Sequence, residues 1–213
     1  MTRVAASLLW IAAAAYAQPV QLTYLGTAGW QIDSGPTAIL IDPYLTRAKV
    51  RSPNDDVAPD DARPLVTGSS IVEPDTAVID AHIHRANYIF LTHTHPDHSL
   101  DMPYIARKTG AIVVGTQSTA NLARASGVPE AQIKVVKGGD ELHLEGFTVR
   151  VISSVHGIFS PPNPSAPVRP PPLFPADAKP PIRYGQHVEG GTLAYLIRIA
   201  GHQIIVFGSM NYI

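Results

Sequence analysis

Four side chains of the kinds that bind metal ions fall within six consecutive residues: His93, His95, Asp97 and His98. In an extended segment, residues i and i+2 project to the same side of the backbone, so His93 and His95 can bind one ion. A turn after His95 would redirect Asp97 and His98, which makes a second, neighbouring metal position geometrically feasible.

The chain contains no cysteine, so any metal at this cluster depends on imidazole and carboxylate ligands. Such ligands favour Zn²⁺, with Mn²⁺ or Fe²⁺ as substitutes. An open coordination position would hold a water whose pKa falls towards about 7, and that water is a nucleophile at neutral pH.

The residues around the cluster predict a strand, a loop and a helix, in that order. Residues 88–91 form a short apolar run typical of a buried strand, and helical spacing begins at Met102. Ser99 or Asp101 can cap this helix, and Gly110 would end it.

Further elements are predicted on both sides of this unit. Residues 21–45 indicate a β-meander whose last strand ends at Asp42, whereas residues 47–80 read as a polar insertion with little regular structure. A helix is expected over residues 118–126. The remaining predicted strands are 111–114, a second antiparallel set at 133–136, 141–145 and 147–153, and a hairpin of 193–200 with 203–207.

The pattern His-x-His-x-Asp-His at a strand–loop–helix junction resembles the signature of the metallo-β-lactamase superfamily, and the match is complete in residues 93–98. The resemblance extends to the strand that ends in residues 40–43 and to a later strand end at residues 153–157. It implies that His93, His95 and His156 bind a first ion, and that Asp97 and His98 begin a second site. Asp97 would also be catalytic, because it would orient or deprotonate the attacking water.

The fold implied by this resemblance is an α/β protein, the αβ/βα four-layer sandwich of the metallo-β-lactamase fold. The implied function is metal-dependent hydrolysis of an ester, lactone, amide or phosphodiester by a metal-bound water, with one or two Zn²⁺ ions and a small-molecule substrate. Within the superfamily, the sequence is more similar to the lactonase- and phosphodiesterase-like branch than to enzymes that degrade antibiotics.

Two features depart from the family pattern. The residue expected to be a bridging aspartate follows a glycine, and here that position is Ser209 after Gly208. A neutral hydroxyl is a poor zinc ligand compared with a carboxylate. The sequence also ends at Ile213, where the family continues with a second half and a last histidine for the second site. The alternative is therefore a metal-binding or remnant protein without turnover.

Other polar residues have two interpretations each. Asp42 would orient a histidine beneath the metal pocket, or is a turn residue before Pro43. His187 could contact substrate or replace a ligand, but an exposed loop position is favoured. His82 and His84 form a second His-x-His without an acidic partner and are expected to be solvated.

Composition limits the classes of partner. The chain has 213 residues, 45% of them hydrophobic and 15% charged, which fits a globular domain with a real core. The formal net charge is −1, whereas a protein that binds nucleic acid usually carries an excess of basic residues. A nuclease of the same superfamily is therefore disfavoured.

The N-terminus has the pattern of an export signal. Arg3 precedes an uncharged apolar run, and Ala15 and Ala17 give the small-x-small pattern at which signal peptidase cuts, so residues 1–17 are predicted to be a signal peptide. An Ala-rich first helix is the alternative. The domain would then span residues 18–213 in a periplasmic or secreted protein that is free of the membrane after cleavage.

A proline-rich loop is predicted at residues 161–181, which contain 10 prolines. Its place between His156 and the last hairpin would set it over the mouth of the metal pocket, where it could limit which substrates enter.

Overall fold

The computed structural model describes residues 19–50, 63, 65–157 and 171–209. The predicted signal peptide lies outside these residues, as does the first half of the predicted proline-rich loop. No helix in the described part of the chain is both long and apolar enough to cross a membrane.

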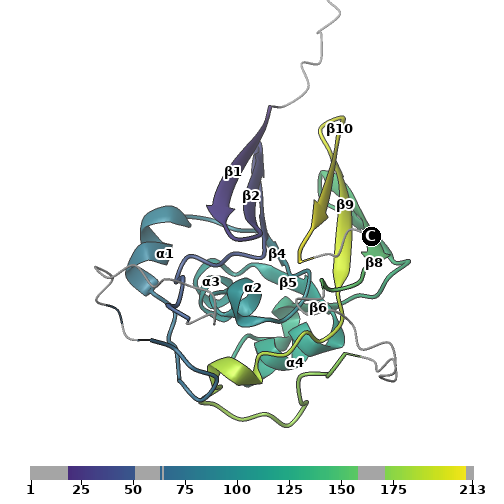
Figure 1. Ribbon diagram of the computed structural model, residues 1–213. Helices are drawn as coiled ribbons and strands as arrows, with labels where there is room; N and C mark the ends of the chain where they lie inside the picture. Colours follow the sequence, from purple (N-terminus) through teal and green to yellow (C-terminus); the bar gives the residue numbers. More distant parts are fainter. Residues whose placement is uncertain (1–18, 51–62, 64, 158–170, 210–213) are drawn as a thin grey trace, which may run out of the picture.

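A six-stranded sheet forms the first layer (Figure 1). Its strands lie in chain order. The first three pair antiparallel to one another, and the third to the sixth pair parallel. They are β1 (Val20–Gly26), β2 (Gly29–Ser34), β3 (Thr37–Ile41), β4 (Tyr88–Phe90), β5 (Ile112–Gly115) and β6 (Ile133–Val135). The expected meander and the strand before the histidine cluster are confirmed.

A four-stranded antiparallel sheet in the order β10-β9-β8-β7 faces the first sheet. Its strands are β7 (Glu141–Leu144), β8 (Phe147–Ser153), β9 (Leu193–Ile199) and β10 (His202–Phe207). The expectation that residues 133–136 join this antiparallel set is wrong. A helix separates β5 from β6, and a helical crossover returns the chain parallel to the strand it left.

Within the described ranges, four α-helices and two short 3₁₀ helices connect the strands. They are α1 (Thr76–His82), α2 (Pro96–Ser99), α3 (Met102–Thr109), α4 (Gln117–Ala125), η1 (Glu130–Gln132) and η2 (Tyr184–Gln186). Gly110 ends α3 in the left-handed conformation at φ 77°, as expected. Helix α1 corrects the prediction of an irregular insertion: Asp75 caps it by accepting the N–H of Val78, and its own Ile79 is buried.

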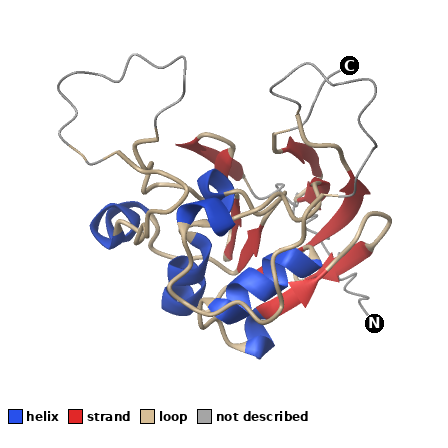
Figure 2. Cartoon of the chain, turned by 60° about the horizontal axis from the view of Figure 1, so that its bottom comes forward, coloured by secondary structure: helices blue, strands red, loops and turns tan. Residues whose placement is uncertain are grey.

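Two hydrophobic clusters hold the layers together. One lies between the helices and the first sheet and includes Ile79, Ile105 and Leu122. The other lies between the two sheets and draws its buried residues from strands and their ends, including Phe90 and Tyr195. Figure 2 shows the helices gathered on one side of the strands. This helix–sheet–sheet order confirms the metallo-β-lactamase fold, and within the described residues the outer helical layer on the second sheet is not seen.

The parallel part of the first sheet sets the position of the chemistry. Strands β3, β4 and β5 run in the same direction, so the residues that follow them meet at one edge. Asp42 follows β3 and donates its N–H to Phe90 O at 3.0 Å, while Leu91 donates its N–H to Val114 O. From the second sheet, the hydroxyl of buried Tyr195 donates to Leu91 O at 2.7 Å. The loop after β4 is therefore fixed from both sheets.

Asp101 begins α3, but its carboxylate does not cap the helix. Both of its oxygens turn to the loop after β3: they accept the N–H groups of Leu45 at 2.6 Å and Thr46 at 2.9 Å, and the hydroxyl of Thr46. The expected cap is thus replaced by a buried tie between α3 and the loop.

We expect Asp101→Ala to lower the free energy of unfolding by about 3 kcal/mol, because two backbone N–H groups lose their acceptor in a buried site. Urea unfolding with a chelator present would measure this change. Asp80→Ala is the control, since Asp80 is on the surface and pairs with Lys108, and it should change little. Equal stability of both variants would contradict the role given to Asp101.

Candidate metal centre

The first two histidines of the cluster lie in the loop that connects β4 to α2. His93 is fully buried in the loop after the strand, and His95, in extended conformation, immediately precedes the first turn of α2 at Pro96. Their ring nitrogens, His93 Nε2 and His95 Nδ1, are 3.1 Å apart. The i, i+2 pair therefore does present its ligand atoms to one point.

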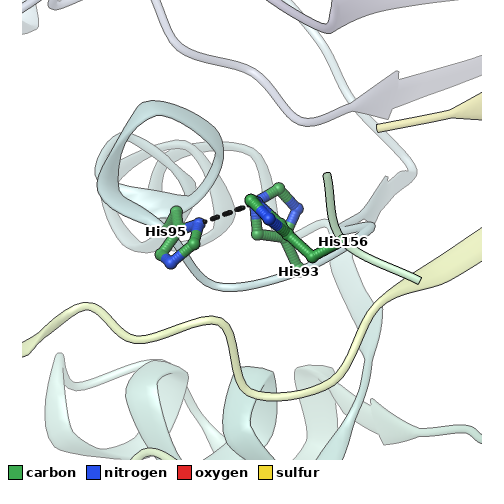
Figure 3. A group of neighbouring side chains, drawn as sticks. All are labelled: His93, His95 and His156. Atoms are coloured by element: carbon green, nitrogen blue, oxygen red, sulfur yellow. Dashed lines mark hydrogen bonds between the residues drawn. The ribbon is translucent and has the colours of Figure 1, made fainter. Parts of the chain in front are cut away.

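The third histidine comes from the opposite sheet. His156 follows β8, and its Nε2 lies 3.1 Å from His95 Nδ1. The ligand atoms of the three residues all fall within 4.8 Å of one another, and Figure 3 shows the three rings converging. No other group of three or more histidine and acidic side chains in the described residues is close enough to hold an ion.

Hydrogen bonds elsewhere on the rings leave too few protons for His93 Nε2, His95 Nδ1 and His156 Nε2 to bond to one another. The hydroxyl of Thr92 donates to Asp42 Oδ2, so its oxygen accepts the Nδ1–H of His93 at 3.2 Å and leaves Nε2 with a lone pair. His156 likewise donates its Nδ1–H to Gly157 O at 2.7 Å. His95 Nδ1 can carry one proton at most, so at least one of the two 3.1 Å contacts places lone pair against lone pair.

A cation would resolve that conflict, and the two 3.1 Å spacings at His95 fit one. Zinc–nitrogen bonds of about 2.0–2.1 Å in a tetrahedron place ligand nitrogens about 3.3 Å apart, close to the 3.1 Å contacts found here. Burial lowers the pKa of His93 and His95, and the neighbouring imidazoles lower it further. Both rings are therefore neutral near pH 7, the form that binds metal.

Beneath the three histidines, Asp42 organises the cluster. It is fully buried, adopts φ 41°, and its carboxylate accepts the N–H of Thr92 at 2.7 Å as well as the Thr92 hydroxyl at 2.6 Å. Oδ2 also accepts the Nδ1–H of His98 at 2.9 Å. Of the two interpretations of Asp42, the structure supports orientation: it holds His98 directly and His93 through Thr92.

The other motif residues lie beside the three-histidine group. His98 is fully buried, and its Nε2 lies 3.1 Å from Ser209 Oγ and 3.6 Å from Asp97 Oδ2. Burial lowers the pKa of His98, but the charge and hydrogen bond of Asp42, with the charge of Asp97, outweigh it and raise the pKa overall. The role of Asp97 and His98 as ligands of a second ion stays a prediction.

A segment from His187 to Thr192 is hydrogen-bonded to the loop that carries the histidine motif. The sequence analysis did not predict this contact. Glu189 O accepts the N–H of Thr94 at 2.9 Å, and Gly190 O accepts the hydroxyl of Thr116 at 2.8 Å. The charge of Glu189 also acts on His95. Because these contacts join residues more than 70 positions apart, no local sequence pattern could predict them.

The favoured interpretation of His187 as an exposed loop residue is wrong. It is buried, with 7% of its surface exposed, and it donates its Nδ1–H to Ser99 Oγ at 2.9 Å. Burial and the charge of His95 lower its pKa to about 4. Ser99, the other expected helix cap, instead donates its hydroxyl to the carbonyls of Thr94 and His95. His82 and His84 are exposed, as expected.

Comparison with known proteins agrees with this geometry. A family model described as "Beta-lactamase superfamily domain" matches residues 21–212. Metal-dependent hydrolases of Agrobacterium fabrum and Oenococcus oeni are 29% and 31% identical over 137 and 140 residues, 64% of this chain and 48% and 49% of theirs. The chain thus spans about half the length of these relatives. A metallo hydrolase from Ignicoccus hospitalis has a similar fold, with a TM-score of 0.55, 16% identity, and coverage of 91% of this chain and 62% of that one.

We expect Asp42→Asn to weaken zinc binding about 10- to 100-fold, because the amide cannot accept all three hydrogen bonds that fix His93 and His98. Competition with a chromophoric chelator would measure the affinity. Asp33→Asn is the matched control, since Asp33 pairs with Arg85 at the surface. Wild-type affinity in a folded Asp42→Asn protein would show that this carboxylate does not position the ligands.

Proposed function

Because the chain belongs to the metallo-β-lactamase superfamily, we propose that it is a metal-dependent hydrolase whose cation is held by His93, His95 and His156. One observation carries the proposal: three ring nitrogens converge with too few protons to bond one another. The cation we propose is Zn²⁺, and Mn²⁺ or Fe²⁺ are compatible with a set of imidazole ligands.

When bound, such an ion would polarise the scissile group and lower the pKa of a water molecule. The residues of the chain supply the rest. Asp97 has 43% of its side chain exposed beside the buried histidines, so its carboxylate can receive the proton that the attacking water loses. Asp42 keeps the imidazoles of His93 and His98 in one tautomer and orientation throughout.

A hollow next to the ligands is the place we propose for the substrate. It has a volume of about 510 Å³, and His95, Asp97, Tyr44, Tyr184 and Arg47 contribute to its lining. Burial raises the pKa of both tyrosines, which therefore stay neutral, and Arg47 adds a positive charge to the same lining as Asp97. This lining suits a small ester, lactone, amide or phosphodiester rather than a polymer of like charges.

A metal-binding protein without turnover is the alternative, and Ser209 is the observation that favours it. The serine hydroxyl lies at His98 Nε2, where a carboxylate would be expected to bridge two ions. A protein of this kind would bind zinc with the same three histidines and hydrolyse none of the four substrate classes.

Metal content and hydrolysis, measured in the wild type and in His95→Ala, test the proposal and separate the two accounts. We expect His95→Ala to lose the bound metal, because His95 Nδ1 contacts both other ligands, and to lose hydrolysis by about 1,000-fold or more. The readouts are metal content by plasma mass spectrometry and rates on chromogenic esters, anilides and phosphodiesters and on a panel of lactones. His202→Ala, at the exposed start of β10, is the control.

Full hydrolysis by His95→Ala would contradict the proposal. Wild-type protein that binds metal and hydrolyses nothing in the panel would support the alternative.

A further inference from the structure

Both ring nitrogens of His98 are already engaged, although the motif would make this residue a ligand of a second ion. Nδ1 donates to Asp42 Oδ2 at 2.9 Å, and Nε2 lies 3.1 Å from Ser209 Oγ. Nε2 either accepts the hydroxyl hydrogen of Ser209 in the neutral ring or donates its own proton to Ser209 Oγ in the protonated ring, and it is engaged in both cases. The lone pair that a second ion would need is therefore used within the chain.

The backbone fixes Ser209 at this point. Ser209 O accepts the N–H of Gly157, next to His156, at 2.6 Å. On its other side Gly208 packs against Thr92 so closely that a Cβ there would lie 2.1 Å from Thr92 Oγ1. The side chain at position 209 is thus held between the loop of His93 and the loop of His156, in contact with His98.

Among the described residues, the negative charge around this point is too small for two adjacent divalent ions. The carboxylate of Asp42 is buried and accepts three hydrogen bonds. Glu189 acts on His95 from the supporting segment, and its Oε1 accepts the hydroxyl of Thr192 at 2.8 Å. In the part of the chain that the structure describes, Asp97 is the remaining carboxylate next to His98, and Ser209 is neutral. Two cations about 3.5–4 Å apart repel strongly unless an anionic ligand bridges them.

We propose that this centre holds one cation, bound by His93, His95 and His156, and that the hydrogen-bonded series Asp42–His98–Ser209 occupies the second position in place of an ion. This inference rests on the proposed metal centre and goes beyond it, because it fixes the number of ions and assigns the cause to position 209.

The test is to count the ions bound by three proteins loaded with excess Zn²⁺ and then desalted. Wild type should retain about one zinc per chain. Ser209→Asp, which supplies the missing carboxylate, should retain about two. Ser209→Asn, neutral and close in size to Asp, is the matched control and should retain about one. Co²⁺ titration gives a second readout: absorption should stop changing after the first equivalent in wild type and after the second in Ser209→Asp.

Two ions in wild type would overturn the inference, and so would a single ion in a folded Ser209→Asp protein, because position 209 would then not set the number. The wild-type count is a test by itself if the carboxylate variant does not fold. Absence of metal from wild type would refute the three-histidine centre, a failure that is distinct from a count of two.

Discussion

The buried carboxylate of Asp42 is the constraint on which the rest of the site depends. It stands at the end of β3 and accepts three hydrogen bonds, two from Thr92 and one from His98. A buried carboxylate is costly unless it is fully hydrogen-bonded, so the loop after β4 must keep the shape that supplies these donors. The same bonds orient the imidazoles of His93 and His98. The stability of the loop and the orientation of these rings therefore depend on the same contacts.

The three proposed ligands reach one point from both sheets. His93 and His95 follow a parallel strand of the first sheet, and His156 follows β8 of the second. A bound ion would therefore join the two layers. The packing of Phe90 against Tyr195 and the bond from Tyr195 to Leu91 hold the layers in register before any ion arrives. Such preorganisation lowers the entropic cost of binding, and the segment from His187 to Thr192 adds to it from below.

Local patterns predicted much of this arrangement, and long-range contacts decided what they missed. The strand before His93 and the helix ended by Gly110 follow from periodicity and turn chemistry over a few residues. Helix α1 was missed because it is short and follows a proline-rich stretch, and its stability depends on the Asp75 cap and on packing of Ile79 against distant elements. The pairing of β6 depends on the crossover through α4. His187 is buried by a partner 88 residues away in sequence, which spacing could not reveal.

The central claim is that three imidazoles from two sheets bind one ion, and X-ray absorption at the zinc edge of the loaded protein tests it most directly. The account predicts about three imidazole nitrogens per zinc at about 2.0 Å, completed by oxygen, with no metal–metal scattering. A zinc surrounded mainly by oxygen, with one imidazole or none, would contradict it. Such a result would mean that the convergence of His93, His95 and His156 is not a metal centre.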